Sequence, residues 1–169
     1  MSAEQFQLAQ ANIARMRAAI DDPVMEGFRS QLETINAIAD RSPGFVWRLQ
    51  TDAGDATAIR AFDDDLIIFN MSVWASTEAL HGYVYKSGHV GPLRNRRDWF
   101  QPLAAPILVL WWIPASHIPT VEEAKSKLQL LNERGPTPGA FTFRQAFPAP
   151  GEQDAHTPIV EAGVCQWAV

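Results

Sequence analysis

One histidine in this chain lies close to its densest cluster of positive charge. His89 follows a serine and a glycine, and Arg94, Arg96 and Arg97 come shortly after it. Because histidine titrates near neutral pH, His89 could act as a general base, a general acid or a metal ligand. An arginine can hold an anionic intermediate through charge-assisted hydrogen bonds. We therefore expect His89 to move a proton and Arg94 or Arg97 to stabilise the oxyanion that forms.

Arg60 is a further candidate for binding a carboxylate or an enolate, because a guanidinium offers paired donors. Each arginine also has a structural interpretation, a surface ion pair with Asp98 or with the acidic run 63–65. Such exposed pairs contribute about 0–1 kcal/mol to stability. His89 also has a structural interpretation, since a histidine at a helix end can form a hydrogen bond with a backbone carbonyl. The sequence leaves both interpretations open.

Amide and aromatic side chains could complete a pocket. The alternation of residues 6–13 predicts a strand that carries Gln10 and Asn12 on one face. If that face points inward, both amides need partners or line a wet cavity. Asn12 could then orient an oxygenated intermediate, or it could simply bond the turn that follows. The candidate walls for an aromatic substrate are Trp47, Trp74 and Trp99, although tryptophan more often packs in a core.

Periodicity and turn signals predict the elements that must position these residues. Asp22-Pro23 begins a helix, because Asp caps it and Pro fits its first turn, and Ser42-Pro43-Gly44 ends it. Ser76 caps a second helix, and the capping box at Thr120 begins another that ends before Gly135. A short helical segment is expected over residues 93–99. Strands are expected over residues 6–13, 45–50, 56–62, 66–74 and 107–113.

This order of elements predicts the fold class. A β-α-β-β-α-β order with one extra helix is typical of an α+β fold, a ferredoxin-like antiparallel sheet with helices on one face. Residues 1–135 are expected to form this domain. The prolines of residues 136–169 predict a C-terminal arm or tail, with a peripheral strand or arm over residues 140–147.

Composition and motif content argue against several classes of function. Net charge is −5 and basic residues form no long run, so nucleic acid is not an expected partner. No apolar stretch approaches the roughly 20 residues of a membrane span, and the single Cys165 fits a reducing compartment, so a cytoplasmic protein is expected. The chain has no histidine pair at i, i+4 spacing, no Cys-x-x-Cys and no phosphate-binding glycine loop. Neither a zinc site nor a nucleotide cofactor is therefore expected.

Residues 66–100 carry a resemblance to a known family. A strand ending in Val73-Trp74 leads into a helix with Glu78-Ala79-Leu80, and Ser87-Gly88-His89 follows. This unit resembles the antibiotic-biosynthesis-monooxygenase-like domains of the dimeric α+β barrel superfamily. The chain as a whole resembles a bacterial family of that superfamily with no assigned function. The resemblance implies a homodimer in which two sheets close into a barrel, each half keeping a cleft between sheet and helices.

The resemblance also implies a function. It points to a small-molecule enzyme, a monooxygenase-like oxidoreductase of secondary metabolism that acts on an aromatic, quinol-like or polyketide-type substrate without a cofactor. Its ligand would be small and aromatic or anionic. Asn12 would share the cleft with Trp74 or Trp99.

Two alternatives stay open. In the heme-degrading branch of the superfamily, the iron-ligating histidine lies seven residues after the helix serine, and that position after Ser87 is Arg94 here. Heme degradation of that kind is therefore disfavoured, but heme could still bind with His89 as its axial ligand. The chain could also be a non-catalytic ligand-binding or dimerisation module, in which the aromatic residues serve only the core and the dimer.

Overall fold

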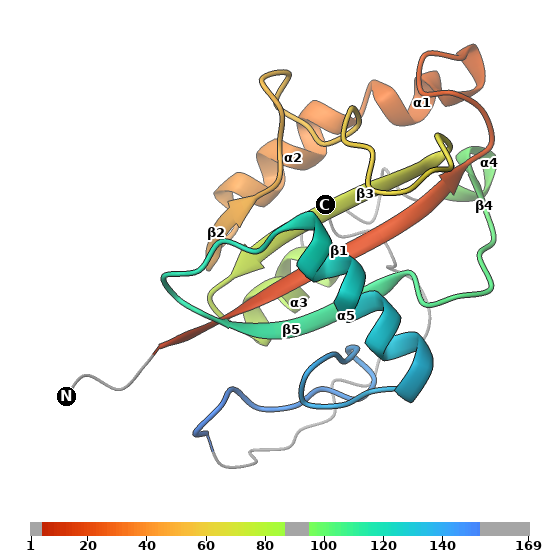
Figure 1. Cartoon of the computed structure of the whole chain (residues 1–169). Helices are drawn as coiled ribbons and strands as arrows, with labels where there is room; N and C mark the ends of the chain where they lie inside the picture. Colours follow the sequence, from red (N-terminus) through yellow and green to blue (C-terminus); the bar gives the residue numbers. More distant parts are fainter. Residues whose placement is uncertain (1–4, 87–94, 153–169) are drawn as a thin grey trace.

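An antiparallel sheet forms the centre of the computed structural model, which describes residues 5–86 and 95–152 (Figure 1). The strands pair in the order β2-β3-β1, and both β5 and β4 pair with the remaining edge of β1. The strands are β1 (Phe6–Met16), β2 (Phe45–Arg48), β3 (Ile67–Trp74), β4 (Phe100–Gln101) and β5 (Leu108–Pro114).

The central strand β1 separates two layers of core side chains. Leu8 lies opposite Trp74 of β3 and Trp112 of β5, while the next residue, Ala9, lies opposite Trp111. Because successive residues of a strand point to opposite faces, these two sets belong to two separate hydrophobic clusters. Trp111 and Trp112 therefore face opposite sides of the sheet, as their adjacency in the sequence predicts.

The connections complete the ferredoxin-like α+β arrangement that the sequence predicts. One helical crossover joins β1 to β2 and another joins β3 to β5, and the hairpin partners β2 and β3 lie side by side. The helical segments are η1 (Pro23–Met25), α1 (Glu26–Arg29), α2 (Leu32–Arg41), α3 (Thr77–Lys86), α4 (Arg96–Trp99) and α5 (Val121–Arg134). Asp22, Ser76 and Thr120 each accept a backbone N–H of the following helical turn, which confirms the predicted starts.

The first predicted helix is interrupted. The sequence predicts one continuous helix from Asp22 to Ser42, whereas the structure breaks it between α1 and α2. The carbonyl of Gly27 accepts hydrogen bonds from the side chains of Ser30 and Gln31, at 3.4 and 2.6 Å. These side chains compete for the carbonyl that the helix would use, and the chain turns before α2 begins.

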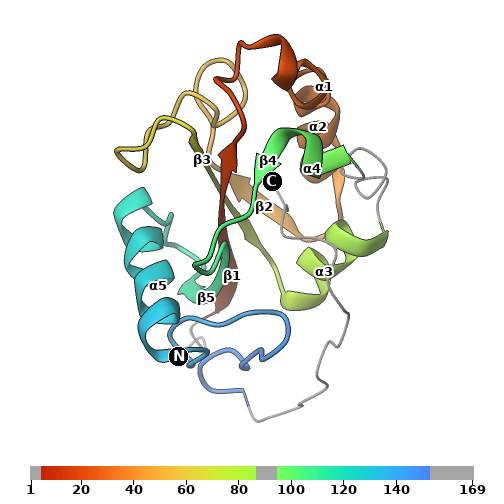
Figure 2. The same ribbon diagram turned by 90° about the vertical axis from the view of Figure 1, so that its right-hand side faces the viewer.

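Helices cover both faces of the sheet rather than one. Figure 2 shows α2 and α3 on one side of the strands and α5 on the other. On the first side, Leu80 and Tyr83 of α3 join the cluster that contains Leu8. On the second side, Leu128 and Leu131 of α5 join the cluster that contains Ala9 and Trp111. The two crossover helices α2 and α3 lie on a single face as predicted, and the extra helix α5 covers the other, because β1 and β5 are buried on both faces.

The predicted strand over residues 56–62 is not formed. These residues belong to the loop between β2 and β3, and the Asp55 carboxylate accepts hydrogen bonds from the backbone N–H and the hydroxyl of Thr57. In this local turn the backbone N–H of Thr57 bonds a side chain, so it is not available for the hydrogen bonds between neighbouring strands. The loop instead places Ala61 in the core on the α5 side.

Residues 140–147 form isolated bridges instead of a peripheral strand. Phe141 exchanges two backbone hydrogen bonds of 2.8 Å with Leu110 of β5, and its side chain is fully buried. Trp112 donates its indole N–H to the carbonyl of Phe147. Side chains of this segment up to Ala149 therefore pack into the domain core, and the expected tail from residue 153 onward lies outside the described residues.

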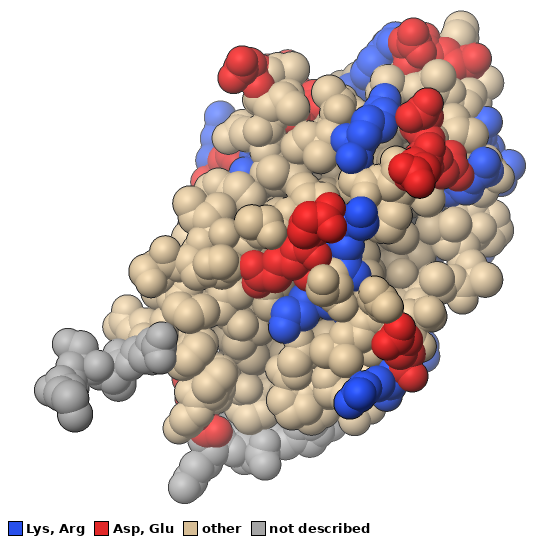
Figure 3. Space-filling view, in the orientation of Figure 1, with Lys and Arg blue, Asp and Glu red and all other residues tan. Residues whose placement is uncertain are grey.

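The surface over α5 carries mixed charge. Figure 3 shows basic and acidic side chains next to one another on this face, with uncharged side chains over most of the area. Lys125 and Glu122 form one such pair at 3.4 Å. Among the described residues, no helix is both long enough and apolar enough to cross a membrane.

Candidate functional site

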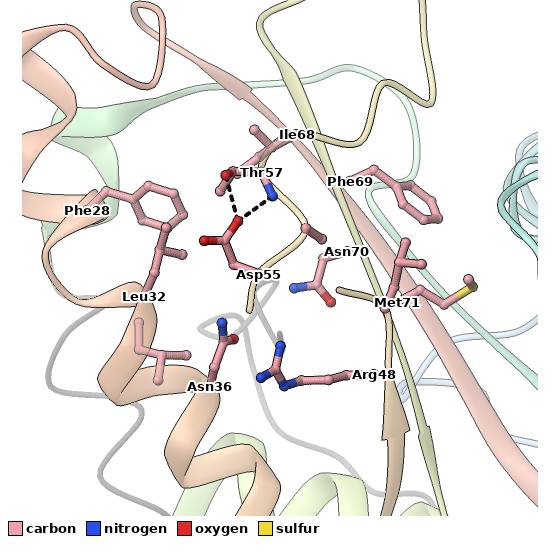
Figure 4. A pocket seen from close by; sticks show the side chains of 13 residues that line it. Phe28, Leu32, Asn36, Arg48, Asp55, Thr57, Ile68, Phe69, Asn70 and Met71 are labelled. Atoms are coloured by element: carbon pink, nitrogen blue, oxygen red, sulfur yellow. Dashed lines mark hydrogen bonds between the residues drawn. The ribbon is translucent and has the colours of Figure 1, made fainter. Parts of the chain in front are cut away.

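A pocket opens between α2, the β2–β3 hairpin and the loop that joins its strands (Figure 4). The empty space between its lining residues amounts to about 600 Å³ when the adjoining open solvent is counted, and the enclosed part is much smaller. Most of its walls are apolar, and a small number of polar side chains face inward, the composition of a typical small-molecule site. Its lining consists of Phe28, Leu32, Ile35, Asn36, Arg48, Leu49, Asp55, Ala56, Thr57, Ile68, Phe69, Asn70 and Met71.

The loop beside the pocket is held in place by its own backbone. Thr51 N–H donates to the carbonyl of Asp55 at 2.8 Å, and Gly54 N–H donates to the carbonyl of Thr51 at 2.9 Å. Gly54 has φ +86, a conformation that favours glycine. Its carbonyl then points back to the domain, where it accepts from Arg48 Nη1 at 2.7 Å and from Asn36 Nδ2 at 3.4 Å.

The buried side chain of Arg48 contacts both α2 and the β2–β3 loop from its position on β2. Only 8% of its side chain is exposed, and its Nε and Nη2 contact the two carboxylate oxygens of Asp40 at 2.8 and 3.3 Å. Its Nη1 binds the loop through Gly54. The guanidinium therefore joins α2, β2 and the loop, and most of its donors are already used within the protein.

Asp55 presents a carboxylate to the pocket. Its Oδ1 accepts from the backbone N–H of Thr57 at 2.8 Å and from the Thr57 hydroxyl at 2.6 Å. For Oδ2 no hydrogen bond or ion pair is found within the described part of the chain. Figure 4 shows this carboxylate between Leu32 and Asn70, turned towards the open space. One oxygen of Asp55 thus fixes the orientation of the carboxylate, and the other can accept a hydrogen bond from a ligand.

Asn36 adds a second acceptor. Its side chain is 4% exposed, and its Oδ1 is buried without a hydrogen-bond partner among the residues that the structure describes. Its Nδ2 donates to the carbonyl of Gly54 at 3.4 Å, so the oxygen is the atom of this pocket-lining amide that lacks a partner. A buried acceptor without a donor is costly, and a ligand hydroxyl or amine in the pocket would satisfy it.

Asn70 connects the pocket to a buried polar row on the sheet. Its Oδ1 accepts from Gln10 Nε2 at 3.2 Å, and the same nitrogen donates to Ser72 Oγ at 2.9 Å. The indole N–H of Trp74 donates to Ser72 Oγ at 2.8 Å. The prediction that Gln10 needs partners on an inward face is confirmed, since it is fully buried and hydrogen-bonded.

The residues expected from sequence are distributed over several places. Asn12 is fully buried on β1 opposite Asn70, and Trp74 is fully buried against the rings of Phe45 and Tyr83. Both lie near the polar row, but neither lines the pocket. Trp47 packs on the opposite face of the sheet, in the cluster on the α5 side.

Three further candidates also lie away from the pocket. Trp99 packs against Phe28 at a ring distance of 6.0 Å, behind the pocket wall. Arg97 is exposed on α4. Arg60 is exposed and lies 3.7 Å from Asp65, as its structural interpretation expects.

His89 and Arg94 lie outside the described residues, so their catalytic roles and the heme alternative stay predictions. Among the described residues, no group of three or more metal-binding side chains is assembled. His81 of α3 packs its ring against Tyr85 at 4.4 Å and near Phe143 at 6.1 Å.

The polar residues of the pocket are absent from the sequence prediction. Asn36, Arg48, Asp55 and Asn70 come from a helix, two strands and a loop, with no common spacing. One local signal was available, since Asp55 and Thr57 at i, i+2 spacing are typical of a side-chain turn. That pattern argues against a strand at residues 56–62, but it does not reveal the pocket.

A comparison with solved structures finds, among others, a cofactor-independent oxygenase and a protein without a function in its name. SnoaB from Streptomyces nogalater, the oxygenase, is 18% identical with a TM-score of 0.42, covering 69% of this chain and 97% of that chain. PA3566 from Pseudomonas aeruginosa is 10% identical with a TM-score of 0.44, covering 69% of this chain and 100% of that chain.

Two further comparisons use the sequence of the chain. No curated protein matches the chain. A family model matches residues 7–157, which include both β1 and the segment that packs Phe141 against β5. The chain therefore belongs to the family described as a domain of unknown function, DUF3291.

Proposed function

We propose that this protein binds a small, mainly apolar molecule with a hydroxyl group in the pocket beside α2, and that Asp55 accepts the hydroxyl proton. The observation that carries this proposal is the Asp55 carboxylate, oriented through Thr57 and turned into an apolar pocket. Phe28, Leu32 and Ile68 offer apolar contacts to a ring or chain.

The acceptors of the pocket favour a ligand that donates hydrogen bonds. Asp55 Oδ2 and Asn36 Oδ1 are both acceptors without a partner among the described residues. A hydroxyl donates one hydrogen bond and so satisfies either oxygen. A simple anion would be repelled by these two acceptor oxygens, and the charge of Arg48 is already paired with Asp40. The pocket therefore favours a neutral hydroxylated compound.

The chemistry that follows is general base catalysis. Asp55 takes the proton, and the bound anion then reduces dioxygen in a monooxygenase-like reaction of the kind that the resemblance of residues 66–100 implies. A CH2 group of the substrate is oxidised to a carbonyl and supplies all four electrons, so that one oxygen atom enters the product and the other leaves as water. An aromatic, quinol-like or polyketide-type substrate fits the apolar walls. His89 and the arginines after it stay predicted as further groups for this reaction.

The test combines binding and turnover. Hydroxylated aromatic and polyketide-type compounds are titrated by isothermal calorimetry, and oxygen uptake is followed with an electrode. Asp55→Asn keeps an acceptor for Thr57 but removes the base. We expect it to retain ligand binding while its turnover falls by about 100-fold or more.

Asp52→Asn is the matched control, because Asp52 is an exposed aspartate in the same loop. It should leave both binding and turnover unchanged. Wild-type turnover in Asp55→Asn would exclude Asp55 as the base. If no compound binds at concentrations up to about 1 mM, the pocket is not the small-molecule site proposed here.

A further inference from the structure

The buried polar row on β1 and β3 ends at the pocket. Asn70, Ser72 and Trp74 alternate along β3, so their side chains lie on the same face, the one that packs against α2 and α3. Gln10 lies opposite Ser72 in the neighbouring strand β1. Both Gln10 and Ser72 are fully buried, and Asn70 is the member of the row that reaches the pocket lining.

The hydrogen bonds of this row orient the Asn70 amide. The indole N–H of Trp74 can only donate, so Ser72 Oγ accepts from it at 2.8 Å. The two hydrogens of Gln10 Nε2 go to Ser72 Oγ at 2.9 Å and to Asn70 Oδ1 at 3.2 Å. With its oxygen engaged by Gln10, Asn70 turns its Nδ2 to the pocket, and Figure 4 shows this nitrogen on the inner side.

We infer that Gln10 is a positioning residue that makes Asn70 a hydrogen-bond donor to the ligand. The pocket then offers one donor, Asn70 Nδ2, together with two acceptors, Asn36 Oδ1 and Asp55 Oδ2. A ligand that matches this set carries a hydroxyl group and, elsewhere on its frame, a carbonyl oxygen. This inference rests on the proposed function and adds the carbonyl to the substrate class.

The reversed arrangement of the two amides gives a different ligand preference. If Gln10 accepted from Asn70 instead, the Asn70 oxygen would face the pocket and would repel a ligand carbonyl. Selectivity between two isosteric ligands therefore separates the two arrangements. Meta-hydroxyacetophenone and meta-isopropylphenol share a phenol and a similar shape, and only the first has a carbonyl acceptor.

The experiment measures both dissociation constants by isothermal calorimetry on the full chain. Wild-type protein should prefer meta-hydroxyacetophenone by about 3- to 10-fold, the value of one hydrogen bond. Gln10→Met keeps a similar volume but removes the donor that orients Asn70. In that variant the preference should fall to about one, with the affinity for meta-isopropylphenol unchanged. A role of Gln10 in folding alone would change both affinities together.

Two variants complete the design. Gln129→Met changes an exposed glutamine of α5 and should keep the wild-type preference. Asn70→Leu removes the proposed donor itself at a half-buried position, and it should abolish the preference even if Gln10→Met does not fold.

The outcomes separate the two proposals. Equal wild-type affinity for both ligands contradicts the inference and leaves the proposed function standing. A preference that persists in Gln10→Met contradicts the positioning role of Gln10, and one that persists in Asn70→Leu contradicts the Asn70 donor. If neither ligand binds wild-type protein, the proposed function fails and the inference fails with it.

Discussion

Arg48 shows how much a single buried side chain contributes to the candidate site. Its side chain is 8% exposed, whereas that of its partner Asp40 is 45% exposed. The planar guanidinium bonds both carboxylate oxygens of Asp40 on one edge and the Gly54 carbonyl through Nη1. This geometry needs several donors in fixed directions, which arginine has and lysine lacks. The pocket loop therefore depends on the chemistry of this residue as well as on its charge.

Arg48→Lys should destabilise the fold and loosen the loop, because one ammonium group cannot replace all three contacts. We expect a loss of about 1–3 kcal/mol in the free energy of unfolding, measured by urea denaturation. Arg60→Lys is the control, since Arg60 is exposed and its nearest acidic oxygen lies at 3.7 Å. It should change the free energy by no more than about 0.5 kcal/mol. Equal effects of the two changes would contradict the structural role of Arg48.

At the scale of the elements, the close approach of β2 and α3 depends on a glycine. Gly44 comes directly before β2, has φ +80, and accepts the N–H of Ala75 at 2.7 Å. A β-carbon at Gly44 would lie 2.5 Å from the β-carbon of Ala79 in α3. The end of the α2–β2 connection therefore packs directly on the helix that follows β3. Gly135 after α5 also has a positive φ, +69, but has open space around it.

Replacing each of these two glycines by alanine distinguishes the cost of a positive φ from the cost of a steric overlap with α3. Gly135→Ala should cost about 1–2 kcal/mol, because its φ of +69 with ψ −171 lies in a backbone region essentially restricted to glycine, and no side chain is nearby to collide. Gly44→Ala adds an overlap with α3 and should cost about 2–4 kcal/mol in total. Thermal and urea unfolding of both variants would measure the difference. Equal losses would show that α3 moves away at little cost, in contrast to the packing described here.

At the scale of the whole molecule, Glu123 connects α5 to the sheet and to the connection that precedes the helix. Its Oε1 accepts from the indole N–H of Trp111 in β5 at 2.8 Å, and its Oε2 lies 2.6 Å from His117 Nε2. Burial alone raises the pKa of Glu123, but the hydrogen bonds from His117 and Trp111 outweigh it. The pKa of the carboxyl group in the folded protein is therefore below its ordinary value of 4.5.

This lowered pKa makes the stability of the protein depend on pH. Ionised Glu123 contributes its full stabilisation above the unfolded pKa, and the contribution is lost as pH falls through the lower folded pKa. Between about pH 6 and pH 3, the urea midpoint of wild-type protein should decrease more than that of Glu123→Gln. The other acidic groups are common to both proteins, so the difference reports on Glu123 together with its partner His117. Parallel decreases would contradict the lowered pKa.

The assembly of whole chains is the last prediction at this scale. The resemblance of residues 66–100 predicts a homodimer. On the second face of the sheet, α5 packs in one cluster with residues of β1, β3 and β5, and the half-buried Trp47 of β2 packs at the margin of that cluster. Light scattering coupled to size-exclusion chromatography should give twice the mass of one chain. A single-chain mass at all concentrations would contradict the dimer.

Local signals explain which predictions succeed. Alternating or continuous apolar residues locate β1, β3 and β5, and capping side chains at Ser76 and Thr120 locate α3 and α5. Such signals act within a few residues, so they are visible in the sequence. The break between α1 and α2 and the absent strand at 56–62 depend on side chains that bond nearby backbone groups. Several conformations compete there, and periodicity alone does not decide between them.

The sequence by itself determined the positions of β1, β3 and β5, the ferredoxin-like topology and the need to satisfy Gln10 on an inward face. Only the tertiary structure decided where the pocket is. Asn36, Arg48, Asp55 and Asn70 come together because α2 crosses over the β2–β3 hairpin and the positive φ of Gly54 turns the loop back. These contacts join residues from separate elements. Their proximity follows from packing, which no spacing along the chain reveals.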